Sequence, residues 1–249
     1  MAGHSHWAGI KHRKAAVDAK RGKVFSKLAK AIISAAREGG GDPALNLKLR
    51  YAVEKARDAN MPRDTIARAV KRGTGELGGE QIQELTYEGY GPGGAALLIQ
   101  TITDNPKRTG PDLRHLIEKR GGSLGKPGSV AWNFELKALF TVPTGSVHED
   151  TLLEAALEAG ADDVTNEGAS FAVTGAPETF GPLEEKLAAI GVRPETSDLT
   201  FLPKSRVMLS AQDARKLIEI IEALEDHDDV QSAITNGDIP DEVLAELGA

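Results

Sequence analysis

The stretch SAQDARKLIEIIEALEDHDDVQSAIT, Ser210 to Thr235, predicts one amphipathic helix followed by one strand. Apolar residues recur inside it at three- and four-residue steps, at Ala214, Leu217, Ile218, Ile221 and Leu224. The run VQSAIT that follows has the composition of a strand. A helix and a strand alone cannot form a core, so they should complete an earlier part of the chain that lacks these two elements.

Residues 82 to 135 are that earlier part. They read as the strands ELTYEGY and AALLIQTI, a helix with Leu113, Leu116 and Ile117 on one face, and the strands GGSLG and SVAWNFE. This is an extra strand followed by β-α-β-β, without the closing α-β of a split β-α-β fold. The helix and strand of residues 210 to 235 would complete it.

Residues 136 to 204 form a complete β-α-β-β-α-β pattern by themselves. The strands are KALFTV, DVTNE, SFAVT and DLTFL, with helical patterns around Leu152 to Leu157 and Leu183 to Ile190. The sequence therefore predicts two ferredoxin-like α/β domains, one inserted in the other. The discontinuous domain comprises residues 82–135 and 205–240, and the inserted domain comprises residues 136–204.

The first 75 residues predict a small basic domain of three helices. The first helix starts near Lys23 and ends at the run REGGGD, and Asp42 with Pro43 is expected to begin the second. Pro62 is expected to begin a short third helix that ends at Gly73. A glycine-rich linker, Gly73 to Gln81, follows. The predicted fold class is thus α+β, with an N-terminal three-helix domain and two ferredoxin-like domains.

Charge is distributed unevenly along this chain of formal net charge -7. Residues 1–75 carry 17 Lys or Arg against 6 Asp or Glu, whereas residues 76–249 carry 13 against 31. Such a polarised chain indicates nucleic-acid contact by its basic part. The acidic domains would orient the basic one, bind protein partners or repel unsuitable surfaces.

Composition excludes several classes of site. The chain has no cysteine, which rules out disulfides and thiolate chemistry and is compatible with a reducing compartment. No apolar run approaches the roughly 20 residues of a membrane span. The basic N-terminus lacks the apolar segment of a secretory signal, and although a mitochondrial transit peptide shares its composition, the stretch runs directly into a helical pattern. We expect a cytoplasmic protein.

The N-terminal arm is the main candidate for nucleic-acid binding. Its cations can follow phosphates while an exposed tryptophan stacks on bases, although a merely solvated basic face remains the alternative. The candidate nucleic-acid-binding residues are Trp7, Lys11, His12, Arg13, Lys14, Lys20, Arg21, Lys23, Lys27, Lys71 and Arg72. Lys107 and Arg108, at a predicted exposed turn, either add a second anion contact or are simply solvated.

No set of residues predicts an enzyme, and we expect no catalytic residue, no metal, no cofactor and no small-molecule substrate. GGSLGKPG, Gly121 to Gly128, has the wrong spacing for a phosphate-binding loop. The carboxylates of EDHDD, Glu225 to Asp229, are expected at a helix end in water, and Asp104 is expected to stand alone. A metal-dependent hydrolase that uses His4 and His6 is a distant alternative.

Several of these stretches together resemble the YebC/PmpR family, whose mitochondrial relative is the translational activator of cytochrome c oxidase subunit I. The motifs are GHSHWAGIKHRKAAVDAKRGKVFSKLAK, NMPRDTIARAVKRGTG, YEGYGPGG, TDNPKRT and KRGGSLGKPGSVAW, in order along essentially the whole chain. Two departures are visible. The family usually has lysine where this chain has His6 and an aromatic residue where Leu116 lies.

The resemblance implies a three-domain α+β protein that binds nucleic acid without catalysis. Some members of the family look like DNA-binding transcriptional regulators, and others look like ribosome-associated translation factors. We therefore expect a DNA-binding transcriptional regulator, with a translation factor that binds ribosomal RNA as the alternative. The expected partners are DNA, ribosomal RNA or both, and no membrane.

Overall fold

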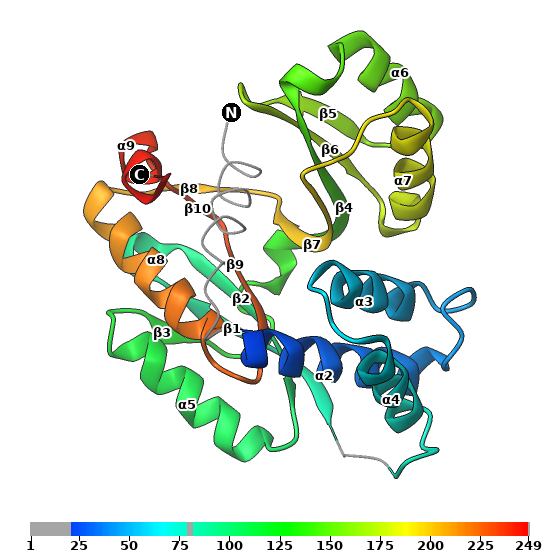
Figure 1. Ribbon diagram of the computed structural model, residues 1–249. Helices are drawn as coiled ribbons and strands as arrows, with labels where there is room; N and C mark the ends of the chain where they lie inside the picture. The colour runs from blue at the N-terminus through cyan, green and yellow to red at the C-terminus, as the bar shows by residue number, and fades with distance from the viewer. Residues whose placement is uncertain (1–20, 79–81, 249) are drawn as a thin grey trace. The chain divides into compact units, whose positions relative to one another are not determined.

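The computed structural model describes residues 21–78 and 82–248. The fold is α+β, with an N-terminal helical part and two four-stranded antiparallel sheets (Figure 1). The chain divides into two compact units. Within the described residues, one contains residues 21–132 and 212–235, and the other contains residues 133–211 and 236–248.

Within residues 21–78 the N-terminal domain contains three helices, as the sequence predicts: α2 (Arg21–Gly39), α3 (Leu47–Asp58) and α4 (Arg63–Gly73). Their apolar faces meet in one core to which Ile32, Leu49 and Ile66 contribute from the three helices in turn. Gly73 allows the end of α4 to approach α2 closely, because a Cβ there would lie 2.6 Å from the carbonyl oxygen of Ile33. This close contact fixes which face of α4 points to solvent.

The start of α3 differs from the prediction. Residues 43–45 form a turn, in which the Asp42 side chain accepts a hydrogen bond from the Ala44 backbone at 2.9 Å. The helix begins instead after Asn46, a buried side chain that accepts from the Leu49 backbone at 3.0 Å and donates to the carbonyl of Ala35 at 2.8 Å. Asn46 therefore caps α3 and ties it to α2, which an exposed Asp42 cannot do.

The first sheet joins distant parts of the chain. Its strands, in the order β3-β1-β2-β9, are β3 (Ser123–Leu124), β1 (Gln83–Tyr90), β2 (Ala96–Thr103) and β9 (Val230–Thr235). Strand β2 pairs with β1 on one side and with β9 on the other, and this explains its almost entirely buried apolar run. The helices α5 (Pro106–Glu118) and α8 (Ala211–Glu225) lie side by side on this sheet (Figure 1).

One predicted strand of this domain is absent. Residues 129–130 form a bend, residues 131–133 form a 3-10 turn, and Phe134 already begins β4 of the other sheet. The place expected for SVAWNFE is taken by β1, the strand that looked like an addition. The hydrogen bonds of β1 with both β2 and β3 make it an interior strand.

The second sheet has the β-α-β-β-α-β order that residues 136–204 predict. Its elements are β4 (Phe134–Pro143), α6 (Glu149–Glu158), β5 (Asp163–Asn166), β6 (Ser170–Gly175), α7 (Phe180–Ala189) and β7 (Thr196–Pro203), with strand order β5-β6-β4-β7. Phe140 and Phe180 pack at 5.0 Å between ring centroids in its core. Each helix connects two strands that are consecutive in the chain but not adjacent in the sheet, which is the arrangement of a ferredoxin-like domain.

The remaining elements are short. The parallel pair β8 (Val207–Met208) and β10 (Gly237–Asp238) precedes the helix α9 (Asp241–Gly248). The 3-10 helices are Pro92–Gly94, Ala131–Asn133, Thr144–Ser146 and Pro177–Thr179. None of the helices within residues 21–78 and 82–248 has the length and apolar character required to span a membrane.

Candidate nucleic-acid interface

Helix α4 presents a row of cations to solvent. Ile66 and Ala69 turn into the core of the helical domain, so the other faces of the helix are exposed. The exposed cations on these faces are Arg63, Arg68, Lys71 and Arg72. The Arg68 guanidinium lies along the helix, with Nε 3.3 Å from the Asp64 carbonyl oxygen.

The spacing of these cations has an energetic consequence. Arg68 stands three and four residues before Lys71 and Arg72, a spacing at which like charges on a helix repel each other by about 0.2–0.5 kcal/mol per pair. A phosphate placed between them removes that repulsion. Among the described residues, no ion pair involves Arg63 or Lys71. Helix α4 is therefore suited to bind an anion.

Helix α2 carries a second row of cations, Lys23, Lys27 and Lys30, which face the acidic segment Glu225–Asp229. Lys23 Nζ lies 3.2 Å from the carboxylate of Asp226, and Lys27 donates to the carbonyl oxygen of Glu225. Burial lowers the pKa of Lys27 below its ordinary value, although the neighbouring acids act in the opposite direction. These lysines are already paired within the protein.

Asp229 is the centre of this network, and its burial corrects the expectation that EDHDD lies in water. Its side chain is 1% exposed, and its carboxylate lies 2.8 Å from both Lys30 Nζ and Arg108 Nη2. The hydroxyl of Thr109 donates to the same carboxylate at 2.8 Å. Burial alone would raise the pKa of Asp229, but the hydrogen bonds from Lys30, Arg108 and Thr109 hold it well below the ordinary value.

Arg108 and Asp104 are likewise not what the sequence indicates. Arg108 donates to Asp104 at 3.1 Å and to Asp229 at 2.8 Å, so it is an ion-pair partner within the protein rather than simply solvated. Asp104, which the sequence predicts to stand alone, is therefore paired with Arg108. Through Lys30 of α2, Asp229 beyond α8 and Arg108 of α5, one carboxylate links the helical domain to the first sheet domain.

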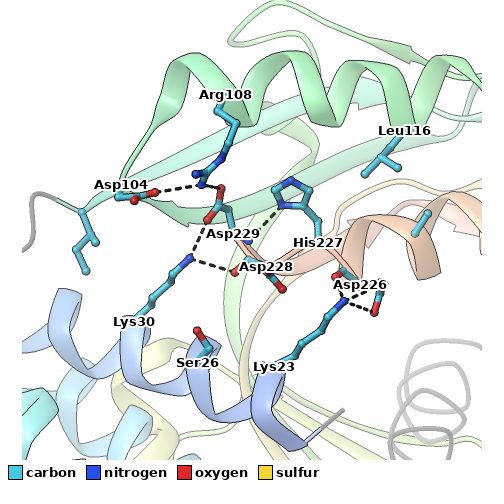
Figure 2. Close-up of a pocket in the computed structure, with 12 residues that line it drawn as sticks. Lys23, Ser26, Lys30, Asp104, Arg108, Leu116, Asp226, His227, Asp228 and Asp229 are labelled. Carbon is cyan, nitrogen blue, oxygen red and sulfur yellow. Dashed lines mark hydrogen bonds and ion pairs between the residues drawn. The ribbon is translucent and has the colours of Figure 1, made fainter. Parts of the chain in front are cut away.

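A cleft of about 740 Å³ lies between these groups (Figure 2). Figure 2 shows Lys23 and Lys30 pointing toward the acidic segment from α2, while Arg108 reaches Asp229 from α5. The cleft thus brings charges of both signs together as ion pairs. In the described part of the chain, no group of three or more His, Asp or Glu residues is arranged to hold a metal ion. The ion pairs attach α2 to the segment between α8 and β9.

The predicted site residues fall into three groups. Trp7, Lys11, His12, Arg13, Lys14 and Lys20 lie outside the described residues. Arg21 is the first residue of α2, on which Lys23 and Lys27 face the acidic segment. Lys71 and Arg72 are exposed in the last turn of α4.

Sequence reasoning missed Arg63 and Arg68 as candidates and missed the paired state of Lys30. The positions of the two arginines could have been found, because the buried positions Ile66 and Ala69 already fix the outward faces of α4. The partner of Lys30 could not have been found from the sequence, because Asp229 is 199 residues away in the chain.

A basic helical domain followed by two α/β domains, one interrupting the other, defines the class of protein. Two family models match the chain: the TACO1/YebC protein N-terminal domain at residues 5–76, and the TACO1/YebC second and third domain at residues 82–237. The chain belongs to the TACO1/YebC family. The resemblance to YebC/PmpR proteins is thereby confirmed.

Full-length relatives support the same assignment. A protein of Acidithiobacillus ferrooxidans named "Probable transcriptional regulatory protein" is 52% identical over 249 residues, which is 100% of this chain and 99% of that protein. A protein of the same name from Maridesulfovibrio salexigens is 50% identical over 247 residues, covering 99% of both chains. The crystal structure of a conserved hypothetical protein from Aquifex aeolicus superposes with a TM-score of 0.83 at 47% identity, covering 94% of this chain and 97% of that one.

Proposed function

We propose that this protein is a regulatory protein that binds nucleic acid through its helical domain and catalyses no reaction. The observation that carries the proposal is the exposed row of cations on α4. Among the described residues, no acid forms an ion pair with Arg63 or Lys71. The charge difference between residues 1–75 and the rest of the chain supports it. The names of the relatives, which describe transcriptional regulators, agree with it.

The first candidate partner is duplex DNA, which makes the protein a DNA-binding transcriptional regulator. Cations at one face of a short helix match the regular spacing of phosphates, and each phosphate neutralised releases counterions. In this proposal the arm residues Trp7 to Lys20, followed by Arg21, extend the contact, and Lys71 and Arg72 with their neighbours on α4 complete it. The acidic domains then keep the rest of the molecule away from the polyanion.

A second candidate partner is structured ribosomal RNA, with which the composition of α4 is equally compatible. The sequence RDTIARAVKRG contains no Asn or Gln, the residues that read adenine in the major groove. Contact led by phosphates suits a folded RNA as well as a DNA duplex. The protein would then act on translation.

The decisive experiment reverses the α4 row in the full chain. The variant Arg63→Glu/Arg68→Glu/Lys71→Glu should lose more than about 100-fold in affinity for a 30-base-pair duplex, and its salt slope should fall by about 3. The matched control Arg193→Glu/Lys204→Glu/Lys216→Glu makes the same charge change at exposed cations outside the helical domain. Equal losses in both variants would reduce the effect to net charge and refute the α4 interface.

Crosslinking in cells separates the two candidate partners. Discrete promoter sites that disappear in the α4 variant support transcription. Ribosomal RNA crosslinks that disappear in that variant, without promoter sites, assign the protein to translation. If the wild type gives neither promoter nor ribosomal RNA crosslinks above the level of the α4 variant, the proposal of nucleic-acid binding is wrong.

A further inference from the structure

Residues 125–132 form a loop that is fixed by a buried carboxylate. Glu88 of β1 is 6% exposed, and its two carboxylate oxygens accept hydrogen bonds from the backbone of Gly128, Val130 and Ala131 at 2.6, 2.6 and 2.7 Å. Burial alone would raise the pKa of Glu88, but these three donors lower it below the ordinary value. These hydrogen bonds hold the loop against β1, with the carboxylate of Glu88 buried beneath it.

Two aromatic rings are exposed on this fixed loop and the strand beside it. Trp132 is 68% exposed and Tyr90 is 39% exposed. The Trp132 indole N–H and the Tyr90 hydroxyl both donate to the carbonyl oxygen of Ser129, at 3.0 and 3.2 Å. The shared acceptor restricts the rotamers of both side chains. Binding a ligand would therefore cost little additional side-chain entropy.

The stretch of sequence that contains Trp132 is basic. Residues 119–134 contain three cations, Lys119, Arg120 and Lys126, and no acid. This is unusual in the part of the chain beyond residue 75, where acids outnumber cations by 31 to 13. Lys119 and Lys126 are exposed, and Lys126 lies within the loop itself.

We infer that this loop binds unpaired nucleotides of RNA, with a base stacked on Trp132 and a phosphate beside Lys126. Exposed aromatic faces among cations bind single strands, because every base has a π-face and the cations follow the backbone. A DNA duplex offers no base face, whereas loops and ends of folded RNA do. A protein partner would also use Trp and Tyr, but the exposed cations Lys119 and Lys126 are complementary to phosphates in particular.

The inference goes beyond the phosphate-led contact proposed for the helical domain, because it adds selectivity for unpaired bases at a separate surface. The test measures binding of a fluorescent 12-nucleotide oligo(U), oligo(dT) and a 30-base-pair DNA duplex to the full-length protein. Trp132→Ala should weaken oligo(U) binding by about 5- to 100-fold, given the usual contribution of one stacked base. Trp132→Phe should stay within about threefold of the wild type, since a phenyl ring still stacks.

Leu157→Ala is the control for removing an exposed apolar side chain, since Leu157 is 63% exposed in the inserted domain. Unchanged oligo(U) binding by Trp132→Ala would overturn the inference, and so would equal losses for oligo(U) and duplex. A loss confined to oligo(dT) would overturn the assignment to RNA. If oligo(U) binding is insensitive while a protein from cells depends on Trp132, the surface is a protein-binding one and the inference fails.

Fluorescence provides a readout that does not require Trp132 to be changed. The chain has 2 tryptophans, so Trp132 is the only one left in Trp7→Phe. Saturating oligo(U) should quench its emission, and saturating duplex should not. Absence of quenching would contradict stacking on Trp132. Failure of the helical-domain proposal would instead appear as duplex binding that is insensitive to the α4 variant, so the two failures are distinguishable.

Discussion

Helices α2 and α4 belong to the same small domain and both carry cations, yet their surroundings differ. Lys23, Lys27 and Lys30 of α2 face the acidic segment Glu225–Asp229, whereas α4 presents Arg63 and Lys71 to solvent. The difference shows that a count of charges overstates the positive surface available to a ligand. On α2 the cations hold two domains together, and on α4 Arg63 and Lys71 have no ion-pair partner among the described residues.

The largest effect is expected from removing the carboxylate that holds the α2 cations. Asp229→Ala should lower the free energy of unfolding by about 3 kcal/mol, because Lys30 would lose its buried partner and Thr109 its acceptor. Urea unfolding measures this loss. Asp226→Ala, at an exposed pair, should cost less than about 1 kcal/mol. Similar values for the two variants would mean that burial does not distinguish these pairs.

Acid should remove the same stabilisation. The pKa of Asp229 is lower in the folded protein than in the unfolded chain, so its contribution is fully present above about pH 4. It is lost as the pH falls from there through the folded-state pKa. The difference in unfolding free energy between the wild type and Asp229→Asn should therefore be constant from pH 5 to 7 and should narrow below pH 4. A constant difference down to pH 2 would contradict the ionised, paired state.

Single substitutions should separate the two helices in binding. Arg63→Ala should weaken duplex binding roughly tenfold at about 0.1 M salt and should reduce the salt slope by about 1, as expected for one lost phosphate contact. Lys23→Ala should remain within about twofold, because Lys23 is already paired with Asp226. Titrations at several salt concentrations measure both quantities. If Lys23→Ala causes the larger loss, α2 is part of the interface.

The smallest effect is expected from neutralising the exposed acids opposite α2. Asp226→Asn/Asp228→Asn should raise duplex affinity by about two- to fivefold at low salt, since an exposed pair contributes at most about 1 kcal/mol. The gain should vanish near 0.5 M salt, where screening is strong. Glu178→Gln/Glu184→Gln, in the inserted domain, controls for net charge. An equal gain in the control would show that the effect is not local to α2.

Local patterns predicted the elements of this protein well. The spacing of Leu217, Ile218 and Ile221 identified α8, and all three side chains are buried. The strand order of the second sheet likewise agrees with the β-α-β-β-α-β pattern. Periodicity succeeds here because each of these elements has one apolar face and one partner layer.

The errors arose where partners are distant in the chain or where a polar side chain is buried. SVAWNFE has strand composition, yet the Glu88 carboxylate holds its first half in a loop. The sequence predicts that the acidic run ending at Asp229 is solvated. In the structure Asp229 is paired with Lys30, 199 residues away in the chain, and with Arg108, 121 residues away. Asn46 was missed because Asp42 and Pro43 form a stronger local helix-start signal.

The pairing of Phe134 with Pro203 has a consequence for the order in which the chain folds. Phe134 is the first residue of β4 and Pro203 is the last residue of β7. Folding of the inserted domain therefore brings the start and the end of its own chain segment together. The separation between Trp132 and Gln212 then shrinks from about 80 residues to an effective length of about 10, which reduces the entropic cost of closing the first sheet by about 2 kcal/mol. We therefore expect the inserted domain to fold first and the pairing of β9 with β2 to follow.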